Sequence, residues 1–155
     1  MVELVKDNQN VIVSRTFSKV YGLAGIRLGY LVARPDIIAR LKLCQADRPN
    51  MLALHAAMTA LDEQDFYQYS LDMNENAKRK IYASLDLLGL PYVKSHTNFV
   101  FFKTGMDIKD FNQAMQEQGV WVGRPFPPYN EWCRVSTGKV EDMDLLTNAM
   151  GKVLG

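Results

Sequence analysis

The stretch from residue 14 to residue 30 reads SRTFSKVYGLAGIRLGY and follows directly on a β-branched apolar triplet. The triplet predicts a short buried strand over residues 10–14, because it is continuously apolar and bounded by polar residues. Apolar residues resume over 26–33, which predicts a second strand. The glycines between the two strands are typical of a turn with a close backbone approach. Two strands joined by such a turn therefore frame Lys19.

The same stretch carries the groups that bind a phosphate dianion. It holds two hydroxyls, two glycines and the Arg27 guanidinium within twelve residues. Hydroxyls, exposed backbone N–H groups and an arginine together bind phosphate. A lysine in the same turn can form a Schiff base with an aldehyde that is bound through that phosphate. Spacing alone leaves a second interpretation open, in which Lys19 is a solvated side chain in an ordinary connection between strands.

Further along the chain, hydrophobic periodicity and capping signals predict a series of helices and short strands. A long helix over 64–88 has one apolar stripe, with Gly89 as its C-cap and Pro91 preventing continuation. An apolar helix over 51–61, with Asn50 as its N-cap, is expected to be buried with His55 inside it. The other expected elements are helices over 35–43, 108–118 and 141–154 and strands over 98–102, 120–122 and 133–136.

Composition excludes several functional classes. The chain has 155 residues with 18 Lys+Arg against 17 Asp+Glu and 48% hydrophobic residues, enough for one domain or two small lobes. A net charge of +1 without a basic run argues against nucleic acid as the main partner. No apolar run approaches the roughly 20 residues that span a bilayer. Cys44 and Cys133 make neither a disulfide framework nor a metal cluster. We expect a cytoplasmic protein with free thiols, no metal site and no membrane partner.

The stretch 14–30 resembles the pyridoxal-phosphate lysine segment of class I/II aminotransferases, and within them the histidinol-phosphate aminotransferase branch. Three later segments resemble motifs of the same branch and occur in the same order: SHTNFV at 95–100, GVWVGRP at 119–125 and CRVSTG at 133–138. The resemblance implies an α/β fold, namely the C-terminal part of a fold-type I pyridoxal-phosphate transferase. It comprises the end of the large-domain sheet and an α+β small domain.

The resemblance assigns a role to each matched residue. Lys19 matches the lysine that binds the cofactor and moves a proton, a task suited to a partly desolvated amine. Thr16, Ser18 and Arg27 match groups that hold the phosphate of pyridoxal 5'-phosphate. Arg134 matches the arginine that binds the substrate α-carboxylate, where a planar bidentate donor suits best. Arg124 is a second candidate for substrate binding. In the branch the corresponding arginine directly follows the strand, whereas here Gly123 lies between the strand and Arg124. A place on the loop surface is an equal alternative for Arg124.

The resemblance also implies a domain plan and a reaction. Residues 1–63 would be a remnant of the cofactor-binding large domain, 64–90 a linking helix and 91–155 the small domain. The implied reaction moves an amino group from histidinol phosphate or an amino acid to 2-oxoglutarate, in a homodimer.

In this family the first half of the subunit supplies the aspartate that faces the pyridine nitrogen. Lys19 comes too early for that half to precede it. We therefore expect the isolated chain to be a truncated piece with weak cofactor affinity and little or no activity. The alternatives are a non-catalytic oligomeric module and a threonine-phosphate decarboxylase-like enzyme.

Overall fold

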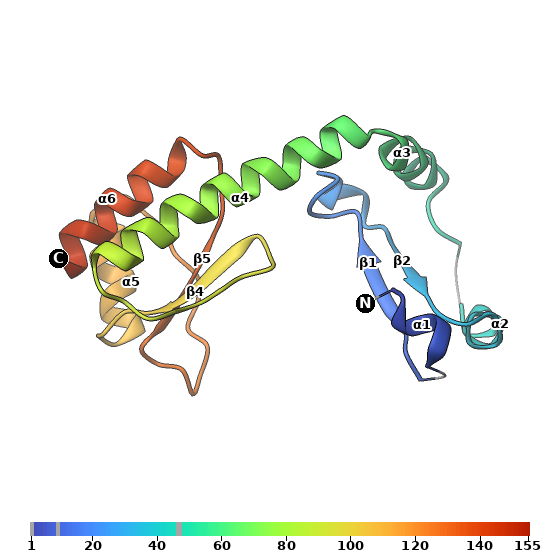
Figure 1. The fold of residues 1–155 in the computed structure, drawn as a ribbon, viewed down its shortest axis with the longest axis horizontal. Coiled ribbons are helices and arrows are strands. Elements are labelled where there is room, and N and C mark those ends of the chain that lie inside the picture. The colour runs from blue at the N-terminus through green and yellow to red at the C-terminus, as the bar shows by residue number, and fades with distance from the viewer. Residues whose placement is uncertain (1, 9, 46–47) are drawn as a thin grey trace. The chain divides into compact units, whose positions relative to one another are not determined.

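The computed structural model describes residues 2–8, 10–45 and 48–155 of the chain (Figure 1). The chain divides into two compact units, Met1–Ser70 and Leu71–Gly155. Their boundary falls within one long helix, α4 (Gln64–Leu87), which was expected over 64–88. None of the helices in the described ranges combines the length and the apolar composition needed to cross a bilayer.

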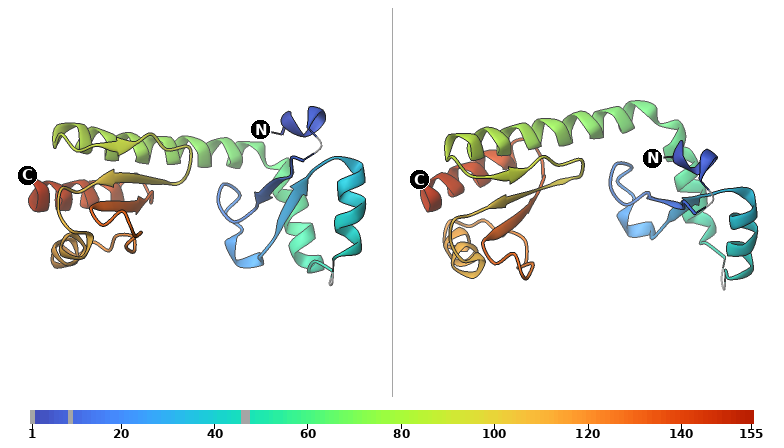
Figure 2. Two further views of the ribbon diagram at one scale, coloured as in Figure 1. Left: turned by 90° about the horizontal axis from the view of Figure 1, so that it is seen from below. Right: turned by 60° about the horizontal axis from the view of Figure 1, so that its bottom comes forward.

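The first unit contains a two-stranded antiparallel sheet, and Figure 2 shows its strands side by side. The sheet pairs Val13 with Val32 at one end and Thr16 with Gly29 at the other. Both expected strands exist, but each is shorter and begins three residues later than expected, and the first, expected to be buried, is exposed except for the half-buried Val13. The second starts late because a 3-10 turn and the left-handed Arg27 (φ 55°) precede it. The elements are α1 (Leu4–Asp7), β1 (Val13–Thr16), η1 (Ala24–Ile26), β2 (Gly29–Val32), α2 (Pro35–Leu43) and α3 (Met51–Asp62).

Helix α3 begins where the sequence predicts it, but its burial differs from the expectation. The Asn50 side chain caps the helix by accepting from the backbone N–H groups of Leu52 at 2.8 Å and Ala53 at 3.3 Å. Only Ala53 and Ala57 of this helix are buried, whereas Leu52 remains 79% exposed. His55, which was expected in the core, is exposed. The buried face of the helix is made of alanines, and several of its larger apolar side chains stay on the surface.

The second unit has a three-stranded antiparallel sheet in the order β3-β4-β5. Helix α4 packs against this sheet through the hydrophobic core. Register places Phe101 opposite Arg134 and Phe99 opposite Ser136. The two-residue strand β3 is too short to show a pattern in the sequence. The elements are β3 (Tyr92–Val93), β4 (Phe99–Lys103), α5 (Ile108–Glu117), β5 (Trp132–Ser136) and α6 (Asp142–Leu154).

The strand expected over 120–122 is not formed. The N–H of Val120 donates to the carbonyl of Met115 at 3.0 Å and thereby completes the C-terminal cap of α5. That N–H is therefore not available to a sheet ladder. The next residue, Gly123, donates its backbone N–H to the Arg134 carbonyl of β5 at 3.0 Å.

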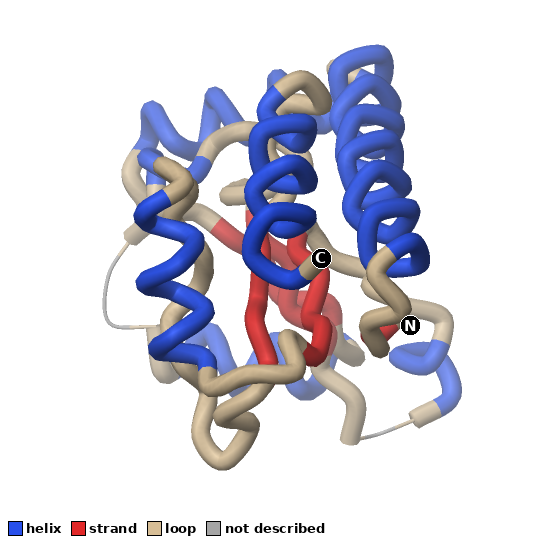
Figure 3. Tube along the Cα trace, turned by 90° about the vertical axis from the view of Figure 1, so that its left-hand side faces the viewer, coloured by secondary structure: helices blue, strands red, loops and turns tan. Residues whose placement is uncertain are grey.

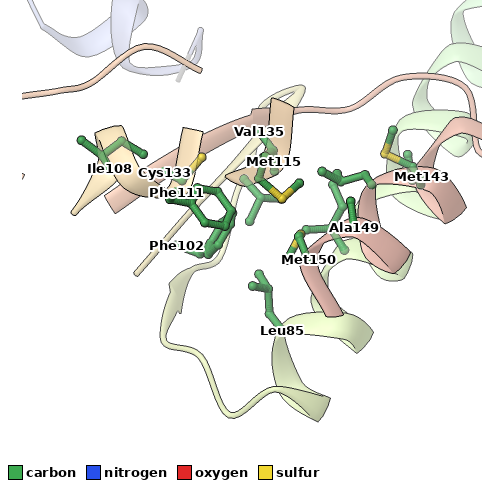
Figure 4. Close-up of a cluster of buried hydrophobic side chains, with 14 residues drawn as sticks. Leu85, Phe102, Ile108, Phe111, Met115, Cys133, Val135, Met143, Ala149 and Met150 are labelled. Atoms are coloured by element: carbon green, nitrogen blue, oxygen red, sulfur yellow. The ribbon is translucent and has the colours of Figure 1, made fainter. Parts of the chain in front are cut away.

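The core of the second unit lies between one face of the sheet and three helices. Alternate strand residues, Val100 and Phe102 on β4 and Cys133 and Val135 on β5, point into it, as the strand period of two requires. Figure 3 looks onto the helical layer, with α6 in front of the strands. The side chains converge in Figure 4, and the helices contribute Ala77, Ile81, Leu85, Ile108, Phe111, Met115, Met143, Leu146, Ala149 and Met150.

The ends of the helices follow the expected capping signals. Gly89 (φ 65°) follows α4, and the N–H of Leu90 donates to the Leu85 carbonyl at 2.9 Å. Gly119 (φ 77°) follows α5 in the same left-handed conformation, which favours glycine because it has no Cβ. These caps turn the chain sharply into β3 and into the loop that carries Arg124.

Candidate functional site

The predicted phosphate-binding groups lie at one end of the β1–β2 pair. Thr16 is the last residue of β1 and pairs with Gly29, the first residue of β2, so Ser18 and Arg27 belong to the connection between them. The Thr16 hydroxyl donates to the Ser18 hydroxyl at 2.9 Å and accepts from the Ser18 backbone N–H at 3.0 Å. The structure therefore brings these two hydroxyls together at the strand end.

Lys19 and Arg27 lie in the same connection, and both side chains are exposed. The Lys19 carbonyl accepts from the N–H of Gly22 at 2.8 Å, which closes a tight turn in which Gly22 has a φ of 68°. Arg27 donates from Nη1 to the Ala24 carbonyl at 2.8 Å. The described hydrogen bond of Arg27 thus runs to its own turn and not to the Thr16–Ser18 pair.

Aromatic packing holds this connection in place. Phe17 is only 4% exposed, and its ring centroid lies 5.1 Å from that of Tyr21 and 5.6 Å from that of Tyr30. Tyr21 also meets Tyr67 at 5.5 Å. Burial raises the pKa of the Tyr21 phenol, and the neighbouring Tyr30 and Tyr67 add to this effect. Tyr21 is therefore a neutral packing residue of the turn.

The chemistry of this group fits a phosphate-bearing aldehyde. Two hydroxyls, one of them bonded to a backbone N–H, and a guanidinium are suited to a phosphate dianion. Lys19 adds a primary amine in the same turn, and its exposure leaves the amine open to a ligand. These residues fit pyridoxal 5'-phosphate by the donors that they present.

A second group of candidate residues lies on the second unit, on the sheet face opposite the core. Arg134 alternates with the buried Cys133 and Val135, so its side chain leaves β5 on the other face. Its Cζ atom lies 5.3 Å from the ring centroid of Phe99 and 4.8 Å from that of Phe126. The Arg134 Nε atom is buried and has no hydrogen-bond partner among the described residues.

Arg124 approaches the same aromatic ring from the loop. Its Cζ atom lies 4.5 Å from the Phe126 centroid, and Nη1 donates to the Pro125 carbonyl at 3.4 Å. The structure therefore brings Arg124 and Arg134 together through Phe126. Sequence reasoning missed Phe126, because nothing in a proline-rich loop indicates which ring will face a distant strand.

A polar network fixes the ends of the strands beside Arg134. The Thr137 hydroxyl shares its proton between the Asn74 side-chain oxygen at 2.8 Å and the Asn98 carbonyl at 2.9 Å. Asn74 in turn donates to the Thr97 carbonyl at 3.1 Å. Helix α4 is thereby tied to the start of β4 and to the end of β5. Sequence analysis did not single out Asn74, since a polar residue on a long helix is usually solvated.

The two cysteines differ in environment, and neither belongs to a metal cluster. Cys44 is exposed, while Cys133 is buried in the core of the second unit. Burial raises the pKa of the Cys133 thiol to about 12. Within the described ranges, no group of three or more histidine, cysteine, aspartate or glutamate side chains is placed to hold a metal ion.

Comparison with known proteins gives the family. Residues 2–150 match the family model described as aminotransferase class I and II. The chain is 39% identical over 153 residues to histidinol-phosphate aminotransferase 1 of Dechloromonas aromatica, covering 97% of this chain and 42% of that protein.

Solved structures agree with this match. A crystal structure from Erwinia carotovora atroseptica has a TM-score of 0.89 and 34% identity, over 97% of this chain and 44% of that one. The histidinol-phosphate aminotransferase of Sinorhizobium meliloti, solved with pyridoxal-5'-phosphate, has a TM-score of 0.81 and 30% identity, over 99% of this chain and 43% of that one. The chain spans less than half the length of these relatives, and it belongs to the class I and II aminotransferase family, where it resembles histidinol-phosphate aminotransferases.

Proposed function

We propose that this chain is the lysine-bearing, C-terminal part of a pyridoxal-phosphate-dependent aminotransferase of the histidinol-phosphate aminotransferase type. The observation that carries the proposal is the Thr16–Ser18 hydroxyl pair at the end of β1, in the same β1–β2 connection as Lys19 and Arg27. Membership of the family and the similarity to the cofactor-bound relative from Sinorhizobium meliloti support it.

Each residue of the group has a distinct task in this proposal. The Thr16 and Ser18 hydroxyls and the Arg27 guanidinium bind the cofactor phosphate. The Lys19 amine binds the cofactor aldehyde and, when free, moves a proton at the substrate Cα atom. When bound, the cofactor supplies an electron sink for the negative charge that develops at that carbon.

The two arginines of the second unit are proposed to bind substrate. Arg134 takes the α-carboxylate of an amino-acid or 2-oxo-acid substrate, since a planar guanidinium forms two parallel hydrogen bonds to a carboxylate. Arg124 takes a second anionic group of the same substrate. The amino donor is histidinol phosphate or an amino acid and the acceptor is 2-oxoglutarate, in a homodimer in the cytoplasm.

Assayed alone, the 155-residue polypeptide is proposed to have little transaminase activity. The hydroxyls, the amine and the Arg27 guanidinium are all at or near its surface, so the polypeptide by itself excludes little water from the reacting atoms. Robust glutamate formation from 2-oxoglutarate by the purified chain, with histidinol phosphate as donor, would contradict this part of the proposal.

A binding comparison tests the phosphate site directly. Equilibrium dialysis should show that the chain binds pyridoxal 5'-phosphate more tightly than pyridoxal, which lacks the phosphate. Arg27→Leu and Ser18→Ala should reduce that preference, because each removes a phosphate donor. The matched control is Arg40→Leu, which removes an exposed arginine from α2 in the same unit. Equal binding of both compounds by the wild-type chain would rule out a phosphate site at this turn.

A further inference from the structure

The loop after Gly123 places one aromatic ring against both candidate arginines. The Phe126 centroid lies 4.5 Å from the Arg124 Cζ atom and 4.8 Å from the Arg134 Cζ atom. A guanidinium within about 6 Å of a ring centroid is attracted by the ring electrons. One ring therefore stabilises two like charges that repel each other.

The Phe126 ring is itself held by the sheet. Phe101, which lies opposite Arg134 in the β4–β5 register, meets Phe126 edge to face at 6.1 Å and 84°. Phe101 is stacked on Trp132 at 5.0 Å and 28°. A tight turn of the loop follows the ring, in which the N–H of Tyr129 donates to the Phe126 carbonyl at 2.8 Å. Contacts with two strands thus fix the position of the ring.

The two guanidinium groups keep their charge available to a ligand. Among the described residues, no carboxylate forms an ion pair with Arg124 or Arg134. The Arg134 Nε atom is buried and finds no hydrogen-bond acceptor in the part of the chain that the structure describes, which is a costly state for a charged donor. Aromatic contacts orient these cations without neutralising them, and this is what an anion-binding site requires.

We propose that Phe126 is a positioning residue that holds Arg124 and Arg134 against one ring, so that the two cations bind a single ligand with two anionic groups. A small dicarboxylate is such a ligand. The inference rests on the proposed function, which assigns both arginines to substrate. It adds the residue that orients them, and it concerns the dicarboxylate 2-oxoglutarate, because histidinol phosphate carries a single anionic group.

Nuclear magnetic resonance of the arginine Nε–H groups in the full 15N-labelled chain tests the proposal. Phe126→Leu and Phe126→Met remove the ring, Phe126→Tyr keeps it, and Trp121→Leu removes an 81% exposed ring elsewhere in the same unit as a matched control. The backbone amide spectrum of each variant reports whether it has folded. The probes are glutarate, with two carboxylates, and butyrate, with one.

Two results are expected. Without ligand, the Arg134 Nε–H signal should move in both ring-less variants towards that of an exposed arginine and should stay in place in Phe126→Tyr and Trp121→Leu. With ligand, glutarate should shift both arginine signals in the wild type and bind more tightly than butyrate. Its dissociation constant should rise about fivefold in the ring-less variants, which lose two cation–ring contacts.

Each contrary result overturns a defined part. An Arg134 signal that is unchanged in a folded ring-less variant, or glutarate binding that is unchanged there, would overturn the role of Phe126. Equal binding of glutarate and butyrate would overturn the joint binding of one dicarboxylate by the two arginines. If glutarate shifts neither arginine in the wild type although the Arg134 signal depends on Phe126, the proposed substrate site fails while the positioning contact stands.

Discussion

Gly123 donates its backbone N–H to the carbonyl oxygen of Arg134 at 3.0 Å, and a Cβ atom on Gly123 would collide with that same oxygen. The colliding atom belongs to the backbone of β5, so it cannot move aside without shifting the strand. This explains the glycine between Val122 and Arg124. Any other residue there would push the Arg124 loop away from the strand that carries Arg134.

Gly123→Ala should therefore lower the free energy of unfolding by about 1–3 kcal/mol, the usual cost of forcing an extra carbon into a packed site. Gly151→Ala is the matched control in the same unit, because a Cβ there meets no atom within 4 Å and the residue lies in α6. That change should stabilise the helix by about 0.5–1 kcal/mol. Urea unfolding followed by circular dichroism measures both, and equal stabilities for the two variants would show that the close approach is absent in solution.

The Asn74 network should contribute to stability in the second unit. Asn74→Ala leaves the Thr97 carbonyl and the Thr137 hydroxyl without this partner, and we expect a loss of about 1–3 kcal/mol in the free energy of unfolding. Asn148→Ala, at an exposed position of α6, should change it by less than about 0.5 kcal/mol. If thermal and urea unfolding give the two variants the same stability, Asn74 does not anchor α4 to the strand ends.

Stability should fall at alkaline pH because of the buried Cys133 thiol. Its pKa is about 12 in the folded chain, above its ordinary value, so the unfolded chain loses the thiol proton first. The contribution of the protonated Cys133 thiol to the free energy of unfolding is fully present below about pH 8.5. It is lost as the pH rises towards 12, at up to about 1.4 kcal/mol per pH unit.

Urea unfolding at a series of pH values from 8 to 11 measures this slope. Cys133→Ala should flatten the curve relative to the wild type, whatever its absolute stability. Cys44→Ala should keep the wild-type slope, because it leaves Cys133 in place. Parallel curves for the wild type and Cys133→Ala would mean that the thiol is reached by solvent in the folded chain.

The sequence predicts much of this structure because the decisive signals are local. Asn50 caps α3, Gly89 ends α4, and Ala77, Ile81 and Leu85 share the buried face of that helix. Two features were not predicted. Val120 gives its N–H to the Met115 carbonyl, a local helix cap that competes with the expected strand, and large apolar side chains of α3 such as Leu52 stay exposed in the first unit.

The candidate site divides in the same way. The turn around Lys19 is contiguous in the sequence, so a motif can identify its residues together. Arg124 and Arg134 contact the same ring, Phe126, which Phe101 supports from β4, the strand that pairs with β5. The pairing register that creates this contact is a property of the folded sheet.

In the proposed function, Lys19 is the amine that binds the cofactor aldehyde. Incubation of the full chain with pyridoxal 5'-phosphate, borohydride reduction and peptide mass mapping test it most directly. Lys42→Arg, at an exposed lysine of α2, is the matched control for Lys19→Arg. We predict that the modification lies on Lys19, persists in Lys42→Arg and disappears in Lys19→Arg. Modification spread over the surface lysines, or equal in both variants, would contradict the claim.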